Sequence, residues 1–377
     1  MSKRKLRVGV IMGGRSGEHE ISIISAASVI EALDKNKYEV VPIGITKTGK
    51  WLAGADTVKL LKNQSQNRLL EKILLPDPGQ KSLMAINNSQ IKPGQKLDVV
   101  IPMVHGTYGE DGKLQGLLEL VDLPYVGAGV LGSAVGMDKI IMKKIFKESG
   151  LKTPDFVYFT KSEWLAKRQQ LLKDIEKQLK YPVFVKPANS GSSVGINKAK
   201  NRQQLIISVK EAAKFDRRII VEQAVKNCRE IECAVLGNDQ PRASLPGEVK
   251  PTHEFYSYAA KYLDEQGAAL EIPAKLSKQL IKQVREMAVR AFRALDLAGM
   301  ARVDFFLNPS GQVYLNEVNT IPGFTKISMY PKLWHSSGLS YPKLLDELIK
   351  LAISRHQEKQ NLRTSYQVKD FWSKAGC

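Results

Sequence analysis

The stretch ARVDFFLNPSGQVYLNEVNTIPG, residues 301–323, decides the fold of this chain. Ala301–Leu307 is apolar and rich in β-branched and aromatic residues, which predicts a strand. Asn308–Gly311 consists of strong turn formers, and Gln312–Val318 predicts the returning strand. The stretch is therefore expected to form a β-hairpin whose loop is the four residues Asn308–Gly311.

Four polar side chains are expected to gather on one face of this hairpin. If the turn residues are the whole loop, Arg302 lies opposite Glu317, and Asp304 lies opposite Leu315. Side chains two residues apart share a face, so Arg302, Asp304, Glu317 and Asn319 point the same way. Unpaired carboxylates on a buried face are costly, and oxygen ligands suit a hard cation such as Mg²⁺. The alternative is a solvated face with a cross-strand ion pair. A loop one residue longer or shorter would break the shared face.

Composition indicates a globular protein with an anionic partner. At 377 residues, with 43% hydrophobic and 25% charged residues, the chain is expected to hold two or three domains. Its 57 basic and 38 acidic residues give a net charge of +19, which favours nucleotides, nucleic acid or phosphorylated metabolites. The basic residues are scattered along the sequence, whereas a nucleic-acid face would need them clustered with exposed aromatic residues. A generally basic surface is therefore favoured, with no nucleic-acid partner.

Cysteines and apolar runs predict a cytoplasmic protein without a membrane partner. Cys228, Cys233 and Cys377 fit no zinc spacing and are too few for a disulfide framework, so a reducing compartment is expected. The apolar run Val8–Met12 is too short for a signal peptide or a membrane span.

The N-terminal part begins like a Rossmann-like α/β unit. Leu6–Met12 predicts a buried strand, Gly13–Gly17 a glycine-rich turn, and Glu18–Leu33 a helix. The spacing of the dinucleotide fingerprint GxGxxG is absent. Glu18 falls in the first helical turn, where the helix dipole stabilises a carboxylate, and this structural role is the alternative to a functional one.

A second candidate ligand loop follows a later strand. Leu97–Val104 predicts a buried strand, and the glycine-rich His105–Gly112 comes where open α/β sheets usually bind ligands. His105 alone is a weak catalytic candidate. Trp51–Leu97 is polar and turn-rich, which is typical of a variable insertion.

A segment of small residues predicts a flap over phosphate groups. Lys186 ends an apolar strand that begins at Pro182, and it shares its face with Phe184. The small residues that follow allow backbone N–H groups to curl around an anion. The segment returns into a predicted strand, Val194–Asn197, so it is not a Walker motif, which would continue into a helix. A plain hairpin is the alternative.

Two further strands and a long loop complete the predicted cleft. Arg218–Glu222 and Glu230–Leu236 predict strands that would form its walls. Ser244–Tyr262 is irregular and aromatic-rich, and a loop of this length is usually functional or disordered. Ser340–His356 predicts the last helix, and Gln357–Cys377 predicts a mobile basic tail.

Together these parts resemble the ATP-grasp fold: a flap between strands, a lysine at a strand end, a carboxylate wall and an Asp…Glu-x-Asn hairpin. The motifs GGRSGEHEIS, HGTYGEDGKLQG, KPANSGSSVG, EIECAVLG, AKY, ARVDF and NEVNTIPGFTKISMYP resemble the D-alanine–D-alanine ligase family from about Val8 to His356. The resemblance implies an α/β (α+β) chain. A Rossmann-like N-terminal domain, 1–136, precedes an ATP-grasp fold of two α+β subdomains, 137–236 and 237–356, and a basic tail, 357–377.

The resemblance implies an ATP-dependent carboxylate–amine ligase. ATP would phosphorylate the carboxylate of a first D-alanine, and the amine of a second would attack that acyl phosphate. The product would be D-alanyl-D-alanine for peptidoglycan precursors. The implied cofactors are ATP and two Mg²⁺ ions, for which Mn²⁺ can substitute, and the implied assembly is a homodimer. A D-alanine–D-lactate ligase of the same fold is the alternative.

The resemblance also implies a role for each matching residue at the nucleotide end. The metal ions would be held by Asp304, Glu317 and Asn319. The phosphates would meet Lys139, Lys186 and the flap residues Ser192, Ser193 and Val194. The base and ribose would meet Phe184, Glu222, the backbone of Ala224 and Val225, and Glu230.

At the substrate end, the first ammonium group would be held by Glu18, with His105 nearby. An oxyanion hole would be formed by Arg302 and the backbone N–H of Gly323. The second carboxylate would be bound by Ser328 and the N–H of Met329. Lys261 and Tyr262 would close over the site, with a hydrogen-bonded chain running from Tyr262 through Ser192 to Glu18.

Overall fold

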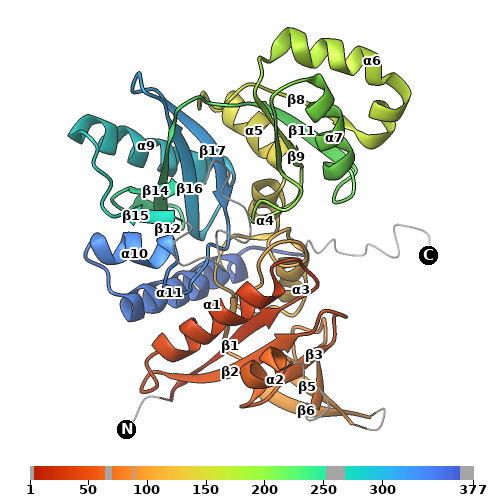
Figure 1. Cartoon of the computed structure of the whole chain (residues 1–377). Helices are drawn as coiled ribbons and strands as arrows, with labels where there is room; N and C mark the ends of the chain where they lie inside the picture. Colours follow the sequence, from red (N-terminus) through yellow and green to blue (C-terminus); the bar gives the residue numbers. More distant parts are fainter. Residues whose placement is uncertain (1–3, 64–69, 88–89, 252–267, 366–377) are drawn as a thin grey trace, which may run out of the picture.

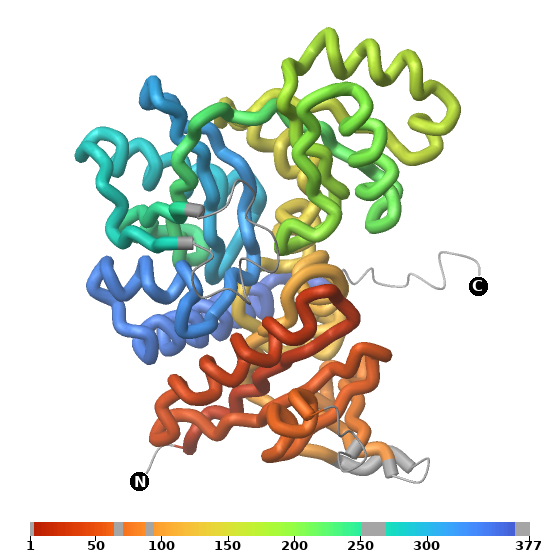
Figure 2. The backbone as a smooth tube through the Cα atoms, viewed as in Figure 1, coloured from red at the N-terminus to blue at the C-terminus, as the bar shows by residue number. Residues whose placement is uncertain are grey.

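Three β-sheets organise the chain (Figure 1). The computed structural model describes residues 4–63, 70–87, 90–251 and 268–365. A seven-stranded sheet forms the N-terminal part, a four-stranded sheet the middle part, and a six-stranded sheet the C-terminal part. Figure 2 shows the chain leaving the first part, building the middle part as a separate lobe, and returning to the third part. None of the helices in these ranges is both long and apolar enough to cross a membrane.

The N-terminal sheet has a parallel centre. Strand β1 (Leu6–Gly13) pairs in parallel with β2 (Tyr38–Ile45) and with β7 (Val99–Pro102), and α1 (His19–Ala32) packs on β1. Side chains of β1 contribute to two different hydrophobic clusters, as expected for a parallel strand that is covered on both faces. The glycine-rich turn after β1 thus lies at the carboxyl edge of the sheet, where ligands usually bind.

The segment predicted to be a variable insertion extends this sheet. Its strands continue outward from β2 in antiparallel pairs. They are β3 (Trp51–Ala53), β4 (Leu70–Leu74), β5 (Ser82–Asn87) and β6 (Gln90–Lys96), with α2 (Thr57–Lys62) between the first two. Two further helices lead toward the middle part: α3 (Lys113–Leu120) and α4 (Val130–Met137).

The middle sheet is antiparallel, in the order β10-β9-β11-β8. Its strands are β8 (Phe156–Thr160), β9 (Val183–Pro187), β10 (Asn197–Ala199) and β11 (Arg218–Gln223). Its helices are α5 (Lys139–Glu148), α6 (Lys161–Gln178) and α7 (Arg202–Ala212). Each of these helices begins at a residue that caps its first turn; α6 begins with a capping box between Thr160 and Glu163.

The strand after the flap begins later than the sequence predicts. The prediction of a strand over Val194–Asn197 is wrong, because β10 begins only at Asn197. The preceding residues form turns instead: the N–H of Val194 donates to the carbonyl of Gly191 at 3.0 Å. Ser192 and Ser193 have φ angles of +46° and +62°, which a strand does not permit.

The C-terminal sheet contains the predicted hairpin. Its strands are β12 (Arg229–Gly237), β13 (Arg242–Ala243), β14 (Gly247–Pro251), β15 (Ala268–Glu271), β16 (Gly299–Leu307) and β17 (Val313–Asn319). The helices of this part are α9 (Lys278–Ala294), α10 (Met329–Ser336) and α11 (Tyr341–Gln360). One face of β16 and β17 packs with α9 in a hydrophobic cluster, so their other face is left for polar side chains.

The loop of the hairpin is one residue longer than predicted. Leu307 pairs with Val313, so the loop runs from 308 to 312. The side chain of Asn308 stabilises the longer loop, because its Oδ1 accepts from the backbone N–H of Gln312 at 2.8 Å. A β-bulge further along the hairpin then returns the polar side chains to a common face.

A β-bulge compensates for the longer loop. Leu315 pairs with Phe305, but the next pair is Asp304 with Glu317, which leaves Asn316 as the extra residue. The predicted pairings of Asp304 with Leu315 and of Arg302 with Glu317 are therefore wrong. The predicted shared face is nevertheless present, because the extra loop residue and the bulged residue each shift the pairing by one residue in the same sense, and a total shift of two returns each side chain to its predicted face.

The last helix joins the C-terminal part to the N-terminal part (Figure 1). It extends to Gln360, so the prediction that the tail begins at Gln357 is wrong by one helical turn. The reason is a set of contacts with the N-terminal part: Arg355 donates to the carbonyls of Tyr125 and Gly127, and His356 Nε2 lies 2.8 Å from Asp122 Oδ1. A Rossmann-like part followed by two α+β parts confirms the predicted fold class.

Candidate active site

A cavity of about 680 Å³ lies where the three parts meet. The N-terminal part contributes Glu18 and His105, α5 contributes Lys139, and the flap contributes Ser192 and Ser193. The residues lining it from the C-terminal part include Arg302, Glu317, Asn319, Gly323, Ser328 and Met329. The structure thus brings together predicted site residues from segments that are far apart in the sequence.

The hairpin carries two carboxylates at directly opposed positions, of which Glu317 lines the cavity and Asp304 does not. Asp304 pairs with Glu317 across the strands, an arrangement that is destabilising for like charges unless a cation lies near. Arg302 Nη2 lies 2.7 Å from Asp304 Oδ2, and Asn319 Nδ2 donates to the same oxygen at 3.0 Å. Lys139 Nζ lies 3.5 Å from Glu317 Oε2. The protein's own cations therefore offset these carboxylates when no other cation is bound.

Arg302 also contacts a carboxylate that sequence reasoning missed. Its Nε lies 2.9 Å from Glu232 Oε2, and Glu232 pairs with Asp304 across β12 and β16. Arg302 therefore lies between two carboxylates. The available signal was that Glu232 follows Glu230 by two residues in a predicted strand and so shares its face.

The donor set of the hairpin suits a hard cation. In the described ranges, no cluster of three or more His, Cys, Asp or Glu side chains has the geometry of a metal site. The candidate set is instead two carboxylates, Asp304 and Glu317, with the amide of Asn319. Oxygen donors of this kind leave coordination positions for water and phosphate oxygens, as Mg²⁺ requires. The residues therefore fit the metal that the sequence predicts.

A buried charge cluster lies beside the hairpin. Lys186 Nζ is 2.7 Å from Glu222 Oε2, and Lys143 Nζ is 3.3 Å from Glu222 Oε1. Burial alone would raise the pKa of Glu222, but the attraction of Lys143 and Lys186 outweighs it and holds that pKa below its ordinary value. Burial lowers the pKa of Lys143 to about 8. Two ammonium groups thus face one carboxylate, which leaves positive charge for an anionic ligand.

Sequence reasoning missed Lys143, although a signal was present. Lys143 follows Lys139 by four residues, so both occupy one face of α5. The carboxylate of Glu222, which the resemblance assigns to the base and ribose of the nucleotide, contacts lysines here. That nucleotide contact, like those of Phe184, Val194 and Glu230, stays a prediction.

The flap reaches across the cavity to the N-terminal part. The hydroxyl of Ser192 donates to the carboxylate of Glu18. Two glycines permit this close approach: a Cβ at Gly106 would lie 2.5 Å from Glu18 Oε2, and one at Gly191 would be closer still. Glu18 is 7% exposed and stands at the N-cap of α1. The predicted link from Ser192 to Glu18 is therefore present, while Lys261 and Tyr262 lie outside the described residues.

Hydrogen bonds connect the base of the flap to the start of α5. The N–H of Asn189 donates to Asp216 Oδ2 at 2.8 Å, and its side-chain amide donates to Asp138 Oδ2 at 3.3 Å. Asp138 also caps α5 by accepting from the N–H groups of Ile140 and Ile141. Lys139 Nζ donates to the carbonyl of Ser190 at 2.7 Å. The flap and the first lysine of α5 are thus positioned as one unit.

His105 is held by contacts from three directions. Its Nδ1 lies 3.1 Å from the carbonyl oxygen of Ile321 and 3.4 Å from Glu110 Oε1, and its Nε2 lies 3.1 Å from Ser25 Oγ. Burial would lower the pKa of His105, but the neighbouring Glu110 raises it above its ordinary value. Burial raises the pKa of Glu110. His105 therefore forms part of the cavity wall beside Glu18.

The segment after β17 forms a tight turn at the cavity. The hydroxyl of Ser328 accepts from the N–H of Thr325 at 2.9 Å, and a Cβ at Gly323 would lie 2.8 Å from it. Ser328 is the N-cap of α10, whose first residue is Met329. Backbone N–H groups at a helix start favour an anion, which fits the predicted binding of a carboxylate here.

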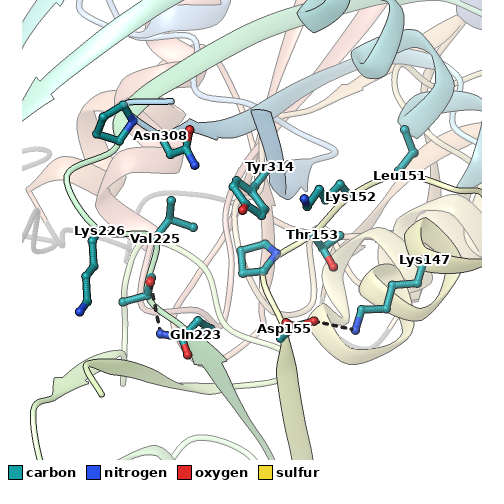
Figure 3. Close-up of a pocket in the computed structure, with 13 residues that line it drawn as sticks. Lys147, Leu151, Lys152, Thr153, Asp155, Gln223, Val225, Lys226, Asn308 and Tyr314 are labelled. Atoms are coloured by element: carbon teal, nitrogen blue, oxygen red, sulfur yellow. Dashed lines mark hydrogen bonds and ion pairs between the residues drawn. The ribbon is translucent and has the colours of Figure 1, made fainter. Parts of the chain in front are cut away.

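Ala224 and Val225 line a different cavity, of about 610 Å³. Figure 3 shows Val225 there with Gln223, Asn308 and Tyr314, at the crossing between the middle and C-terminal parts. None of the hairpin's polar face residues lines this second cavity in the described part of the chain. The predicted adenine contact of Ala224 and Val225 stays a prediction.

Comparisons with known proteins agree with this site. Residues 7–128 match the family model for the D-ala D-ala ligase N-terminus, and residues 145–350 match that for the D-ala D-ala ligase C-terminus. A D-alanine–D-alanine ligase of Natranaerobius thermophilus is 49% identical over 96% of this chain and 99% of its own length.

Solved structures give the same result. The D-alanine–D-alanine ligase of Coxiella burnetii has a TM-score of 0.82 at 39% identity, with full coverage of both chains. The VanG D-Ala:D-Ser ligase of Enterococcus faecalis has the same TM-score at 36% identity, covering 93% of this chain and 100% of its own. On these matches, which span both halves of the chain and every segment of the cavity, the chain belongs to the D-alanine–D-alanine ligase family.

Proposed function

We propose that this protein joins two D-alanines at the expense of ATP, with an acyl phosphate as the intermediate. One observation carries the proposal: a face suited to Mg²⁺, a phosphate flap and an acidic side chain, Glu18, converge on one cavity. Such a site can hold a nucleoside triphosphate next to an amino acid. The product would serve peptidoglycan precursor synthesis.

At the nucleotide end, we propose that Asp304, Glu317 and Asn319 hold two Mg²⁺ ions, for which Mn²⁺ can substitute. The ions would offset phosphate charge and align the phosphoryl transfer. Lys139 and Lys186 would bind phosphate oxygens. Arg302, which contacts Asp304 in the present structure, is then released toward the substrate while Glu232 keeps its other side.

At the substrate end, the carboxylate of Glu18 would hold the ammonium group of the first D-alanine. Arg302 and the N–H of Gly323 would form an oxyanion hole. They would stabilise the negative charge that develops on the carboxyl oxygen of the first D-alanine when the amine attacks its carbonyl carbon. Ser328 and the N–H of Met329 would bind the carboxylate of the second D-alanine. The hydroxyl of Ser192, which donates to Glu18 in the structure, would link closure of the flap to occupation of Glu18.

The choice of the second substrate is the point on which relatives of this fold differ. A D-Ala:D-Ser ligase shares the fold at 36% identity, so the fold alone does not select the nucleophile. We propose that the polar phenol of Tyr262 favours an amine over the hydroxyl of D-lactate. Names of relatives over 94–96% of the chain support D-alanine as the second substrate.

We further propose that the protein is a cytoplasmic homodimer. Within each chain, the domains would meet at about residues 136 and 236. Exposed apolar side chains on α3 and α4, Leu120, Val130 and Leu131, support the second copy, because such patches commonly mark protein contacts. Light scattering of the wild type and of Leu131→Glu tests this assembly. A wild-type monomer at micromolar concentration would contradict it.

The function is tested by phosphate release from ATP with single D-amino acids offered in turn. D-Alanine alone should release phosphate and yield D-alanyl-D-alanine by mass spectrometry. Addition of D-serine or D-lactate should change the product little. Phosphate release without D-alanine, or a mixed product in excess over the dipeptide, would overturn the proposal.

A further inference from the structure

The geometry points to Lys143 as a positioning residue for the metal-binding hairpin: its ammonium group holds the bulged residue Asn316, so that Glu317 and Asn319 face the cavity. This inference rests on the proposed metal site. It adds a residue that touches neither metal nor substrate and acts through the backbone of β17.

The bulge decides which way the metal ligands point. The hairpin loop contains one residue more than the shared face allows, and Asn316 absorbs the difference between the pairs Phe305–Leu315 and Asp304–Glu317. Without a bulge at this place, the side-chain period of two would turn Glu317 away from Asp304. A contact that holds Asn316 in place therefore also determines the direction in which Glu317 and Asn319 point.

Lys143 makes the contact that fixes this residue. Its Nζ donates to the backbone carbonyl of Asn316 at 2.8 Å. The side-chain oxygen of Asn316 is buried and has no hydrogen-bond partner among the described residues, so the side chain does not supply the anchor. A carbonyl freed from the ladder by a bulge needs a donor, and a buried ammonium group provides a strong one.

The ammonium group is itself held from the middle sheet. Lys143 is 1% exposed and lies 3.3 Å from Glu222 Oε1, at the end of β11. Glu222 also contacts Lys186, the lysine that is predicted to bind the phosphates. Lys143 thus connects the sheet that would hold the nucleotide to the hairpin that would hold its metal.

A buried ammonium group needs acceptors in either role, so the two roles are distinguished by what its loss does to metal affinity. A purely structural role predicts that loss of the ammonium group lowers stability and leaves metal affinity unchanged. A positioning role predicts a loss of metal affinity in a folded protein. Partners one step removed from a metal typically change affinity by roughly 10- to 100-fold when they are mutated.

The experiment measures Mn²⁺ binding by electron paramagnetic resonance, in the absence of D-alanine and with ADP present. Lys143→Met keeps the length of the side chain without its charge, and Lys143→Arg keeps the charge. Lys144→Met is the matched control, because Lys144 is exposed on the same helix. Thermal unfolding of each variant establishes that it is folded.

Lys143→Met should weaken Mn²⁺ binding by roughly 10- to 100-fold, Lys143→Arg should recover most of it, and Lys144→Met should bind as the wild type does. If Lys143→Met does not fold, Lys143→Gln replaces it and the same outcomes apply. Wild-type Mn²⁺ affinity in the folded variant overturns the inference.

Glu317→Ala separates this inference from the proposed function. If Glu317→Ala abolishes Mn²⁺ binding and Lys143→Met leaves it intact, only the role of Lys143 is refuted. If Glu317→Ala binds Mn²⁺ as well as the wild type does, the metal site itself is refuted and the inference falls with it.

Discussion

Replacing Glu222 by glutamine tests the buried charge cluster directly. The substitution keeps the volume of the side chain but leaves the ammonium groups of Lys143 and Lys186 without their carboxylate. Both lysines are buried, so water cannot take over the role of the lost partner. Breaking a buried pair in this way costs about 3–5 kcal/mol of the free energy of unfolding.

The assay is urea unfolding at neutral pH, with Glu211→Gln as the control. Glu211, in the last turn of α7, pairs with Lys214 just beyond that helix at 2.6 Å; both side chains are exposed, and loss of such a pair costs less than about 1 kcal/mol. A non-hydrolysable ATP analogue should reduce the loss in Glu222→Gln, because its phosphates would supply negative charge near Lys186. Equal destabilisation by the two substitutions would refute the cluster as a buried, unbalanced set of charges.

The pH dependence of this difference has a definite sign. The lysines hold the pKa of Glu222 below its ordinary value of 4.5 despite burial. The stabilisation by the carboxylate is therefore fully present above pH 4.5 and is lost as the pH falls through the lower, folded-state pKa. The free energies of unfolding of wild type and Glu222→Gln should converge at acidic pH.

Three further predictions concern activity. Glu317→Gln removes a charge from the metal-binding face at constant volume, so turnover should collapse while thermal unfolding stays close to that of the wild type; full turnover would mean that the hairpin is structural only. Lys186→Ala should raise the KM for ATP by roughly tenfold or more, since a charged hydrogen bond contributes about 1.5–3 kcal/mol, and should change the KM for D-alanine much less; equal changes would indicate a folding defect. If Tyr262 makes the hydrogen bond to Ser192 that the resemblance implies, Tyr262→Phe should lose roughly 0.5–1.5 kcal/mol, keep dipeptide synthesis and gain D-alanyl-D-lactate, most visibly at low pH where the competing amine is protonated. Product analysis with both nucleophiles present measures this, and absence of ester at every pH would exclude Tyr262 from nucleophile choice.

The hairpin shows how far sequence alone could reach. Its strands, its turn and its polar face are all predictable from residue types and the period of two. Its register is not, because the side chain of Asn308 closes a longer loop and the bulge at Asn316 then corrects the faces. The loop contact joins residues only four positions apart, but residue types alone do not tell that Asn308 makes it, and the bulge is held by Lys143 from another element.

Long-range contacts explain the other differences in the same way. Lys143 looks like one of several basic residues on an amphipathic helix until the fold brings Glu222 and the carbonyl of Asn316 to it. The final turn of α11 looks like the start of a polar tail until Lys359 meets Glu119 on the N-terminal part. In both cases the partner lies on another element. The sequence pattern therefore indicates the basic character of each segment but not the contact that its lysine makes.

The docking of α11 has a consequence for how the chain folds during synthesis. Leu344, Leu348 and Ala352 belong to the same hydrophobic cluster as Val8 and Val10 of β1, and Arg355 binds a carbonyl at Gly127, 228 residues earlier. The first sheet to leave the ribosome is therefore made well before α11, which contacts α1 and β7 and completes this hydrophobic cluster. Contacts of such long sequence separation form slowly, so the N-terminal part is expected to complete its packing only after the C-terminal part has been made.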